Sequence, residues 1–436
     1  MDLNEKFLYH IWDAGHLKHD LKTLSGKSLK IIYQGQFNTD RGPDFRNSII
    51  EIEGSTYRGD IEIHLKTSDW NSHNHAEDNH YNGLILHIVL QHNLTSPYTI
   101  LEDGGQAEIL ELGNYLSDDI DKLMNLHQSE PEVAINSYCE LLSAVETDTL
   151  ISLLNVLGKQ RFLSKVKRFN AGLGLSSFDQ IIWEGMMESI GYNKNKMNML
   201  QLAQNVTMDM IKGWINDGAE LNEMISILLV SSGLLSRSGK LLGQELCERI
   251  TSTYERQRYF YRKLDPDWQL FRIRPANHPL YRLIHLTRLV YATPNLLTDF
   301  LLREELLAEE PKALKRGLAK LFNLPPCEAY DDLPKLGSGT LSTMLVNILI
   351  PIQYLYYQKI GDNLMTKRLM NSYSAQPGLA DNYITRFMMS HLNPGQEERV
   401  SSREIWQQGL IELYYRHCRF HLCRECKESY LRLEDM

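Results

Sequence analysis

Long hydrophobic runs are missing from this sequence of 436 residues. Its longest apolar stretch, residues 345–352, is far shorter than the roughly 20 residues that cross a bilayer as a helix. The first residues, Met1 to Lys6, lack the basic and then apolar pattern of a secretory signal. The six cysteines are scattered rather than arranged as a disulfide framework. We therefore expect a cytoplasmic protein with reduced thiols and no membrane partner.

Internal repeats and low-complexity linkers are also missing from the sequence. A chain with 43% hydrophobic and 23% charged residues is ordinary for a globular protein, which excludes collagen-like and wholly disordered classes. The length suggests two or three domains, each able to bury a core. The pattern changes from mixed to helical between residues 115 and 135. We therefore predict an α/β domain at residues 1–125 and an all-helical domain at residues 126–436.

Basic side chains are scarce in residues 1–125, which carry 20 acidic and 10 basic side chains and nine of the 15 histidines. The rest of the chain is nearly balanced, with 35 acidic and 36 basic side chains. A net charge of −9 does not indicate a bulk nucleic-acid binder, because counterion release needs clustered Lys and Arg. An acidic, His-rich segment can instead concentrate metal ligands, or simply form a solvated acidic surface.

The periodicity of apolar residues predicts the elements of the first domain. The predicted elements are a helix at residues 3–13, a strand at 28–33, a hairpin of strands 48–53 and 57–66 around Gly54, a central strand at 84–90, and a second hairpin around residues 103–105. Helical segments then follow at residues 142–157, 197–215, 221–236 and 400–422. The fold class that these elements predict is α+β, a mixed sheet with flanking helices followed by a large all-helical region.

Two acidic residues stand where neighbouring strands should bring them together. Asp44 follows Gly42 and Pro43 at the mouth of one strand, in a turn that Pro43 stiffens. On the next strand Asp60, Glu62, His64 and Lys66 alternate with apolar residues and therefore share one face. Four ionisable groups on one face need partners if they are buried, so they face either water or a metal ion.

Phosphodiester hydrolysis is a reaction that uses ionisable side chains arranged in this way. Asp44 and Glu62 are expected to chelate Mg²⁺ or Mn²⁺, which favour oxygen ligands. The ion would polarise the phosphate and lower the pKa of its bound water. His64 or Lys66 would then orient that water or stabilise developing charge. The alternative is a hairpin whose charged face is solvated.

The order of these elements resembles the PD-(D/E)XK nuclease superfamily, which implies a restriction-endonuclease-like sheet and nuclease activity. Pro43 and Asp44 match its PD element, Glu62 matches the second acid, and Glu5 is a possible accessory acid. The sequence departs at the lysine position, where His64 stands and Lys66 follows one pleat later. This departure puts catalysis in doubt more than the fold.

A dense histidine cluster follows the stripe. His73 and His75 stand beside two acids and His80 within residues 73–81. They are expected to bind a metal, hold a carboxylate or contact phosphate. His87 lies within an apolar strand and is expected to be a hydrogen-bonded core histidine, and Trp70 a packing anchor.

Several of these segments together are similar to an uncharacterised bacterial family of unknown function. They are residues 42–45, 59–64, 69–75 and 85–89, residues 272–279, and the terminal cysteine cluster. The similarity spans nearly the whole chain and is more specific than the nuclease resemblance. It implies a bacterial intracellular protein but no activity.

Arginines and aromatic residues alternate between residues 254 and 274, with six basic and three acidic side chains. This mixture suits phosphate contact and base stacking. A helix that buries its aromatic residues and solvates its arginines would look the same. Arg272, Arg274 and Arg282 are the best candidates for binding an anionic substrate such as DNA or RNA.

The C-terminus contains the one dense cysteine group. Cys423 and Cys426 have the spacing with which two thiolates grip one tetrahedral metal ion. Cys418, with His417 or His421, is expected to complete a Zn²⁺ site. The alternative is a reduced helix end whose thiols behave as small hydrophobic groups.

The leading hypothesis from the sequence is a metal-dependent nuclease that cleaves nucleic-acid phosphodiesters. A catalytically silent scaffold that binds nucleic acid or a protein would use the same fold without turnover. A third hypothesis is a zinc-dependent hydrolase of another substrate, with His73 and His75 in the metal site.

Overall fold

The computed structural model describes residues 5–116, 139, 142, 145–256, 264 and 266–430. The chain forms two compact units. The first contains residues 1–158, 382–397 and 408–436, and the second contains residues 159–381 and 398–407. The predicted boundary at residues 125–126 lies outside the described residues.

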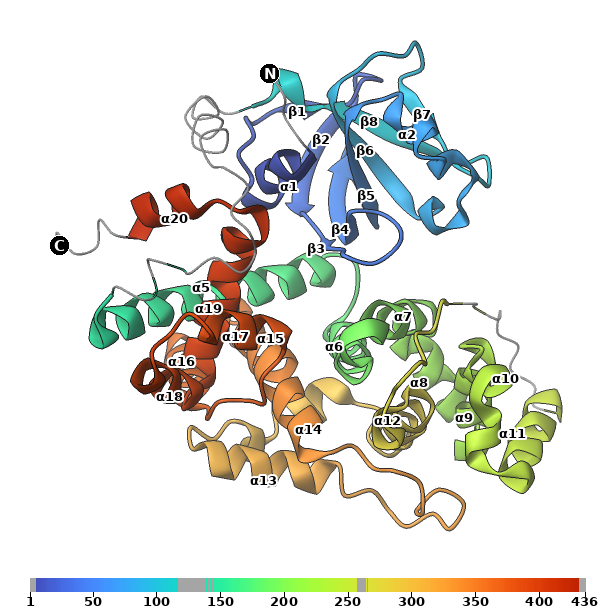
Figure 1. The fold of residues 1–436 in the computed structure, drawn as a ribbon. Helices are drawn as coiled ribbons and strands as arrows, with labels where there is room; N and C mark the ends of the chain where they lie inside the picture. Colours follow the sequence, from blue (N-terminus) through green and yellow to red (C-terminus); the bar gives the residue numbers. More distant parts are fainter. Residues whose placement is uncertain are drawn as a thin grey trace. The chain divides into compact units, whose positions relative to one another are not determined.

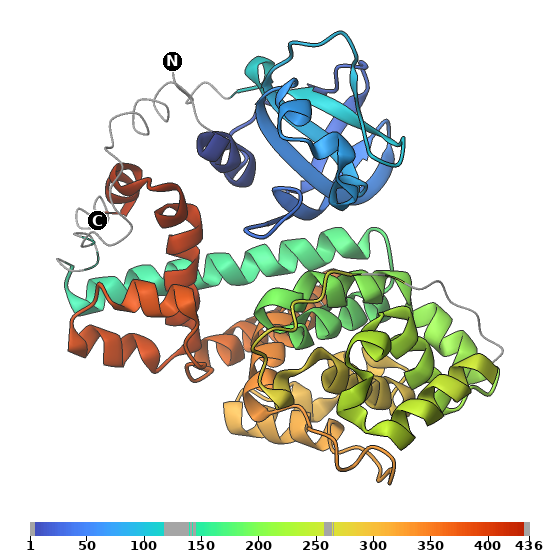
Figure 2. The ribbon, with the colours of Figure 1, turned by 45° about the vertical axis from the view of Figure 1, so that its right-hand side comes forward.

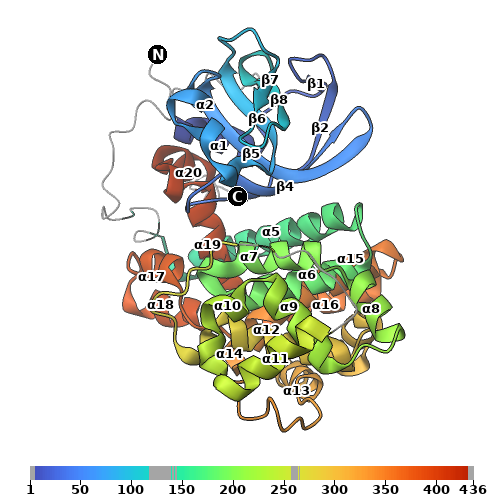
Figure 3. The same ribbon diagram turned by 90° about the vertical axis from the view of Figure 1, so that its right-hand side faces the viewer.

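The first unit is built around a mixed eight-stranded sheet, drawn in blue in Figure 1. Its strand order is β1-β2-β4-β5-β6-β8-β7, and β3 pairs with β4. The strands are β1 (Leu21–Lys22), β2 (Ser28–Tyr33), β3 (Gln36–Phe37), β4 (Phe45–Ile52), β5 (Ser55–Lys66), β6 (Leu84–Gln91), β7 (Tyr98–Ile100) and β8 (Gln106–Glu111). The pairs β5–β6 and β6–β8 are parallel and the other pairs are antiparallel. Figure 3 shows that the sheet is strongly curled. The α+β prediction, a mixed sheet followed by a large helical region, is confirmed.

Both predicted hairpins are present. In the first, Ile52 pairs with Ser55 across a two-residue turn. The turn residues Glu53 and Gly54 have φ angles of 49° and 77°, as the tight turns that match the twist of paired strands require. In the second, β7 and β8 pair around residues 101–105. β6 lies between two parallel neighbours, which explains its nearly continuous apolar sequence.

Different elements cover the two faces of the sheet. Helix α1 (Glu5–Ala14) packs its apolar side, including Trp12, against Ile61 and Ile63 of β5. Because side chains alternate along a strand, Glu62 and His64 point to the opposite face. That face is covered by residues 69–81, which form α2 (Asp69–Ser72) and two 3-10 helices, His75–Glu77 and Asn79–Tyr81.

The far end of the chain also packs in the first unit. It contains α17 (Tyr383–Met389), most of α19 (Glu404–Arg416), a 3-10 helix at Cys418–Phe420 and α20 (Cys423–Tyr430). Arg419 Nη2 lies 2.6 Å from the Asp13 carboxylate, and its guanidinium lies 4.7 Å from the centre of the Phe37 ring. The C-terminal segment is therefore attached to α1 and β3.

The second unit is helical. Its helices are the later part of α5 (Thr147–Leu173), α6 (Phe178–Ile190), α7 (Tyr192–Asn205), α8 (Met208–Asn216), α9 (Leu221–Ser231), α10 (Leu234–Ser238), α11 (Gln244–Arg256), α12 (Pro279–Ala292), α13 (Pro311–Leu321), α14 (Ser338–Met344), α15 (Ile350–Lys359) and α16 (Asn363–Ala375), while α18 (Pro394–Ser401) is shared between the units. Figure 2 shows α5 as one unbroken helix.

Three long helical segments predicted from the sequence are each divided in the structure. The segment 400–422 contains the end of α18, then α19 and the 3-10 helix Cys418–Phe420. The segment 197–215 is interrupted before Thr207. Thr207 caps α8, because its side chain accepts a hydrogen bond from the backbone N–H of Met210. Gly233, with φ of 70°, separates α9 from α10. Local capping and a left-handed glycine therefore interrupt an otherwise continuous apolar pattern.

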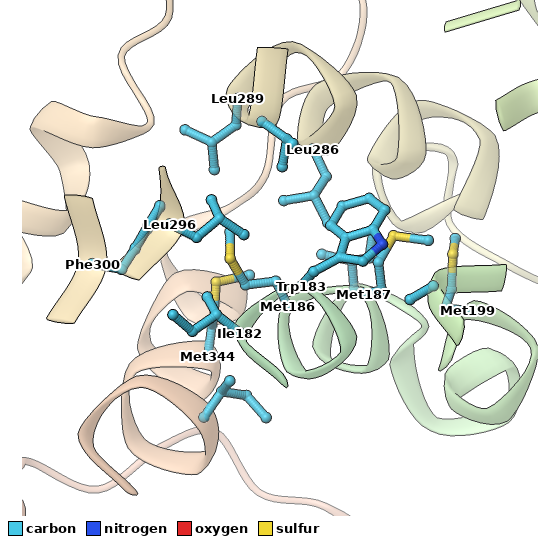
Figure 4. Packing of buried hydrophobic residues seen from close by; sticks show 14 of the residues in the cluster. Ile182, Trp183, Met186, Met187, Met199, Leu286, Leu289, Leu296, Phe300 and Met344 are labelled. Carbon is cyan, nitrogen blue, oxygen red and sulfur yellow. The ribbon is translucent and has the colours of Figure 1, made fainter. Parts of the chain in front are cut away.

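A large apolar core holds the second unit together. Figure 4 shows Trp183, Met186 and Met187 of α6 packed against Leu286 and Leu289 of α12. The indole N–H of Trp183 donates to the carbonyl oxygen of Val206 at 2.8 Å, so the one polar atom of this buried ring is paired.

In the described part of the chain, no single helix has the length and apolar composition to cross a membrane. One bent pair, residues 221–231 and 234–242, meets both criteria together across an angle of 84°.

Candidate metal centre

A clamped turn places Asp44 at the mouth of β4. The side-chain amide of Asn38 donates to the carbonyl oxygens of Asp40 and Pro43, both at 2.9 Å. Gly42 has φ of 102°, and a Cβ at this position would lie 2.6 Å from the Arg46 guanidinium. The turn therefore needs glycine at residue 42 and presents the Asp44 side chain in one fixed direction.

Asp44 and Glu62 come together across β4 and β5. The Glu62 carboxylate accepts from the backbone N–H of Asp44 at 3.0 Å, and the Asp44 carboxylate accepts from the backbone N–H of Ile63 at 2.9 Å. These two bonds hold both carboxyl groups against the backbone where β4 and β5 lie side by side.

Burial governs the electrostatics of this carboxyl pair. Glu62 is only 5% exposed. Burial raises the pKa of Asp44 to about 8, and the negative charge of Glu62 acts in the same direction. Burial likewise raises the pKa of Glu62 to about 8. A cation bound between these two buried carboxyl groups would favour their charged forms.

Three histidines bring their ring nitrogens to the same place. The ligand atoms of His64, His73 and His75 all lie within 4.8 Å of one another. The Glu62 carboxylate joins them, at 3.4 Å from His64 Nε2 and 3.3 Å from His75 Nε2. Asn74, with φ of 61°, turns the chain between His73 and His75. Glu62 and the three histidines form what we call the His/Glu cluster.

Aromatic rings surround the cluster on one side. The His75 ring lies 4.2 Å from the ring of Tyr81 and 5.4 Å from that of Trp70, measured between ring centres. The rings of His64 and His75 are stacked, with centres 5.2 Å apart. Trp70 is therefore a packing residue, as the sequence predicts, and what it packs against is the cluster.

His87 and Thr99 extend the cluster into the sheet. His64 Nδ1 lies 2.9 Å from His87 Nε2, and His87 Nδ1 lies 2.8 Å from the Thr99 hydroxyl. If His87 donates to Thr99, its Nε2 accepts from His64 Nδ1–H, which leaves a lone pair on His64 Nε2. That nitrogen faces His73, at 3.3 Å, and Glu62. His87 is a hydrogen-bonded core histidine, as the sequence predicts.

Two imidazoles of the cluster, those of His64 and His75, have pKa values shifted toward the neutral form. Burial lowers the pKa of His64 to about 2, and the neighbouring histidines act in the same direction. Burial also lowers the pKa of His87 to about 3 and lowers that of His75. Neutral imidazole is the form of histidine that binds metal ions.

Helix α1 contributes two further groups. The hydroxyl of Tyr9 hydrogen-bonds to the Asp44 carboxyl group. Glu5, one turn earlier on the same helix, is close enough to His73 and His75 to interact with them electrostatically. Burial raises the pKa of Glu5. The sequence-based prediction named Glu5 but missed Tyr9, although residues four apart share a helix face.

The other candidate residues of the stripe lie outside the cluster. Lys66 is exposed near the end of β5, and its backbone N–H donates to Asp69. Asp60 accepts from the backbone N–H of Asn47 at 2.9 Å.

The three candidate arginines belong to the second compact unit. Arg272 is exposed and lies over the exposed ring of Phe271, and Arg274 is exposed before a 3-10 helix. Arg282 is only 3% exposed, and it donates to Ile190, Asn277 and Thr340. These internal bonds argue against substrate binding by Arg282. Residues 257–263 of the Arg/aromatic segment lie outside the described residues.

The candidate zinc ligands at the C-terminus lie on two short elements of the first unit. Cys418 is half-buried, Cys423 is exposed and Cys426 is buried. His417 has another partner, because its Nε2 lies 3.3 Å from the Tyr430 hydroxyl. His421 adopts a left-handed conformation, with φ of 59°.

Comparison with known proteins gives one match. A family model described as "Protein of unknown function (DUF2851)" matches residues 5–380. No curated protein and no solved structure matches the chain. The matched range includes the carboxyl pair and the His/Glu cluster and ends before Cys418. The evidence for an activity therefore comes from the site itself.

Proposed function

Because the chain belongs to DUF2851, a family of proteins of unknown function, we propose its function from the side chains of the site. The proposed function is metal-dependent hydrolysis, with nucleic-acid phosphodiesters as the leading substrate class. Glu62, His64, His73 and His75 would hold the ion, and Asp44 would complete its surroundings. One observation carries this proposal. The ligand atoms of the three imidazoles lie within 4.8 Å of one another, and the buried Glu62 carboxylate lies within 3.4 Å of two of these imidazoles.

The donor set favours a transition metal ion over magnesium. Mg²⁺ is bound by oxygen ligands in a near-octahedral arrangement. Imidazole nitrogens suit Zn²⁺ and other first-row metals, and mixed oxygen and nitrogen donors suit Mn²⁺. The sequence alone led us to expect Mg²⁺ or Mn²⁺. The three histidines favour Mn²⁺ or Zn²⁺.

Each side chain has a definite task in the proposed reaction. A bound divalent ion supplies a Lewis acid and lowers the pKa of a coordinated water. We assign His64 as a ligand rather than a base, because its Nδ1 is engaged by His87 and its Nε2 faces the cluster. Asp44, which is held by Tyr9 and the Ile63 N–H, would orient a water beside the ligands.

The resemblance of the Pro-Asp and acidic strand elements to PD-(D/E)XK nucleases supports a phosphodiester substrate. A zinc-dependent hydrolase of another substrate is the second candidate, and the observation that favours it is the excess of nitrogen over oxygen donors in the cluster.

The test is hydrolysis by the purified full-length chain with Mn²⁺, Zn²⁺ or Mg²⁺. Substrates are single- and double-stranded DNA and RNA, with bis(p-nitrophenyl) phosphate as a general phosphodiester. We expect cleavage that falls more than about 100-fold in Glu62→Gln and His75→Ala, since loss of a residue that only orients a metal ligand already costs about 10–100-fold. His80→Ala is the matched control, because His80 belongs to the same loop but bonds to Asp78.

Three outcomes would overturn the leading proposal in different ways. Absence of cleavage in the presence of bound metal would leave a non-catalytic binding scaffold. Cleavage that is unchanged in Asp44→Ala and Glu62→Gln would show that the activity arises elsewhere. Hydrolysis of other esters or amides, but of no phosphodiester, would favour the zinc hydrolase.

A further inference from the structure

The C-terminal cysteines lie on a sharp reversal of the chain. Cys418 begins the 3-10 helix Cys418–Phe420, and Cys423 begins α20. Between them the backbone N–H of Leu422 donates to the carbonyl oxygen of His417 at 3.1 Å, and His421 takes the left-handed conformation. The reversal turns α20 back toward Cys418.

Cys423 and Cys426 lie on one side of the first turn of α20. Residues three apart in a helix are neighbours on its surface. Cys423 is exposed and Cys426 is buried, so the pair runs from the surface into the unit. The thiols of both cysteines are close enough to that of Cys418 to interact with it electrostatically.

A fourth thiol reaches this place from a distant part of the sequence. The backbone N–H of Cys139 donates to His391 Nδ1 at 3.4 Å. The His391 ring packs on Phe387, and Phe387 packs on Tyr414, which interacts with Cys418. The Cys139 thiol itself interacts with those of Cys418 and Cys426. All four residues belong to the first compact unit, and none of the four forms a disulfide bond.

A divalent cation stabilises thiolates that would otherwise repel one another. Four thiolates in tetrahedral geometry are a preferred set of ligands for a structural zinc ion.

We propose that Cys139, Cys418, Cys423 and Cys426 form a structural zinc site of four thiolates. His417, a ligand candidate from the sequence, bonds to Tyr430 through Nε2, and its Nδ1 lies 4.0 Å from the Glu425 carboxylate. No three of the described sulfur atoms lie within 4.8 Å of one another. Zinc–sulfur bonds of about 2.3 Å therefore require the side chains to rotate inward.

The zinc site would stabilise the C-terminal segment, which contacts helix α1 next to the His/Glu cluster. Glu425, between two of the cysteines, lies 3.5 Å from His10 of α1. The same helix carries Glu5 and Tyr9. Zinc at the cysteines would thus stabilise one side of the proposed active site without taking part in its chemistry.

The experiment measures the zinc content of the full-length chain, purified without chelator. The double variant His73→Ala/His75→Ala removes the His/Glu cluster as a competing zinc site. In this background we expect about one zinc ion per chain. Cys139→Ser, Cys418→Ser and Cys426→Ser should each lose it. Cys247→Ser and Cys327→Ser, in the second unit, should retain it.

Alkylation of the native chain provides a readout that does not depend on how the variants fold. In the wild-type chain, we expect exposed Cys423 to resist iodoacetamide until a chelator is added. Modification of Cys423 at the same rate with and without chelator would overturn the proposal. Zinc retained in Cys139→Ser would overturn the fourth ligand, and iron with acid-labile sulfide would overturn the assignment of zinc.

Discussion

Single residues decide which nitrogen atoms of the His/Glu cluster are free. A neutral imidazole has one donor and one acceptor nitrogen, and its partners choose between them. The Thr99 hydroxyl lies at the buried end of a series of hydrogen bonds that runs from Thr99 through His87 to His64. Partners of this kind orient metal-binding histidines.

Thr99→Val should weaken metal binding although Thr99 is not a ligand. Without the hydroxyl, His87 Nδ1–H loses its acceptor, so the His87 tautomer that leaves His64 Nε2 free is no longer favoured. We expect Mn²⁺ to bind about tenfold more weakly, as measured by isothermal titration calorimetry. Thr23→Val is the control, because Thr23 is also buried in this unit but bonds to Ser25. Equal affinities in the two variants would rule out this role for Thr99.

A buried histidine in the second unit should make its stability depend on pH. Burial lowers the pKa of His285 to about 4, and the charges of Arg288 and Lys335 act in the same direction. In the unfolded chain a histidine titrates near 6.5, so between pH 6.5 and pH 4 the unfolded state binds more protons. The free energy of unfolding therefore falls as the pH falls through this window.

The size of this effect can be measured by urea denaturation at pH 7 and pH 5. We expect His285 to account for about 2 kcal/mol of the loss in unfolding free energy. His285→Phe keeps a flat ring against Phe322. Between pH 7 and pH 5, its free energy of unfolding should fall by about 2 kcal/mol less than that of the wild type. A variant with the same pH dependence as the wild type would contradict the assignment.

At the residue scale, the sequence predicts groups that follow a local pattern. Alternation along β5 correctly places Glu62 and His64 on one face, away from Ile61 and Ile63. The contacts of Thr99 and Tyr9 depend on the curl of the sheet and the position of α1. Neither is encoded in local spacing, apart from the one-turn separation of Glu5 and Tyr9.

At the scale of elements, strands were predicted more accurately than helices. The strand at residues 28–33 and both hairpins are found where alternation and turn residues place them. The long helical segments were predicted without their interruptions at Thr207 and Gly233. Apolar periodicity continues through such breaks, because both flanking helices bury the same core.

Close packing of α6 gives a test of how its helix meets its neighbours. Gly185 lies in α6, where an added Cβ would stand 2.4 Å from the Cγ2 atom of buried Ile348. Gly185→Ala should lower the free energy of unfolding by about 1–3 kcal/mol, because a packed core resists added volume. Gly213→Ala, in α8 of the same unit, meets no atom within 4 Å and should raise it by about 0.5–1 kcal/mol. Urea denaturation measures both, and changes of the same sign would contradict this packing.

At the scale of the whole molecule, distant parts of the chain complete the first unit. Asp13 and Arg419 are paired, and so are Val145 and Gln396, across hundreds of residues. No periodicity or motif in the sequence signals such contacts. The sequence prediction took His417 or His421 as the fourth ligand of the cysteine site, because no local pattern links Cys139 to the C-terminal cysteines.

Because the chain forms two compact units, we predict that a bound metal ion stabilises only the unit that contains the His/Glu cluster. A ligand that binds only the folded state stabilises it by about 2.7 kcal/mol at a concentration of 100 Kd. Mn²⁺ should therefore slow amide hydrogen exchange in β5, β6 and residues 69–81, which hold the His/Glu cluster. Helices α6, α9 and α12 belong to the other unit and should exchange at unchanged rates. The double variant His73→Ala/His75→Ala should show no response to Mn²⁺. Protection that spreads equally through both units, or persists in the double variant, would place the binding site elsewhere.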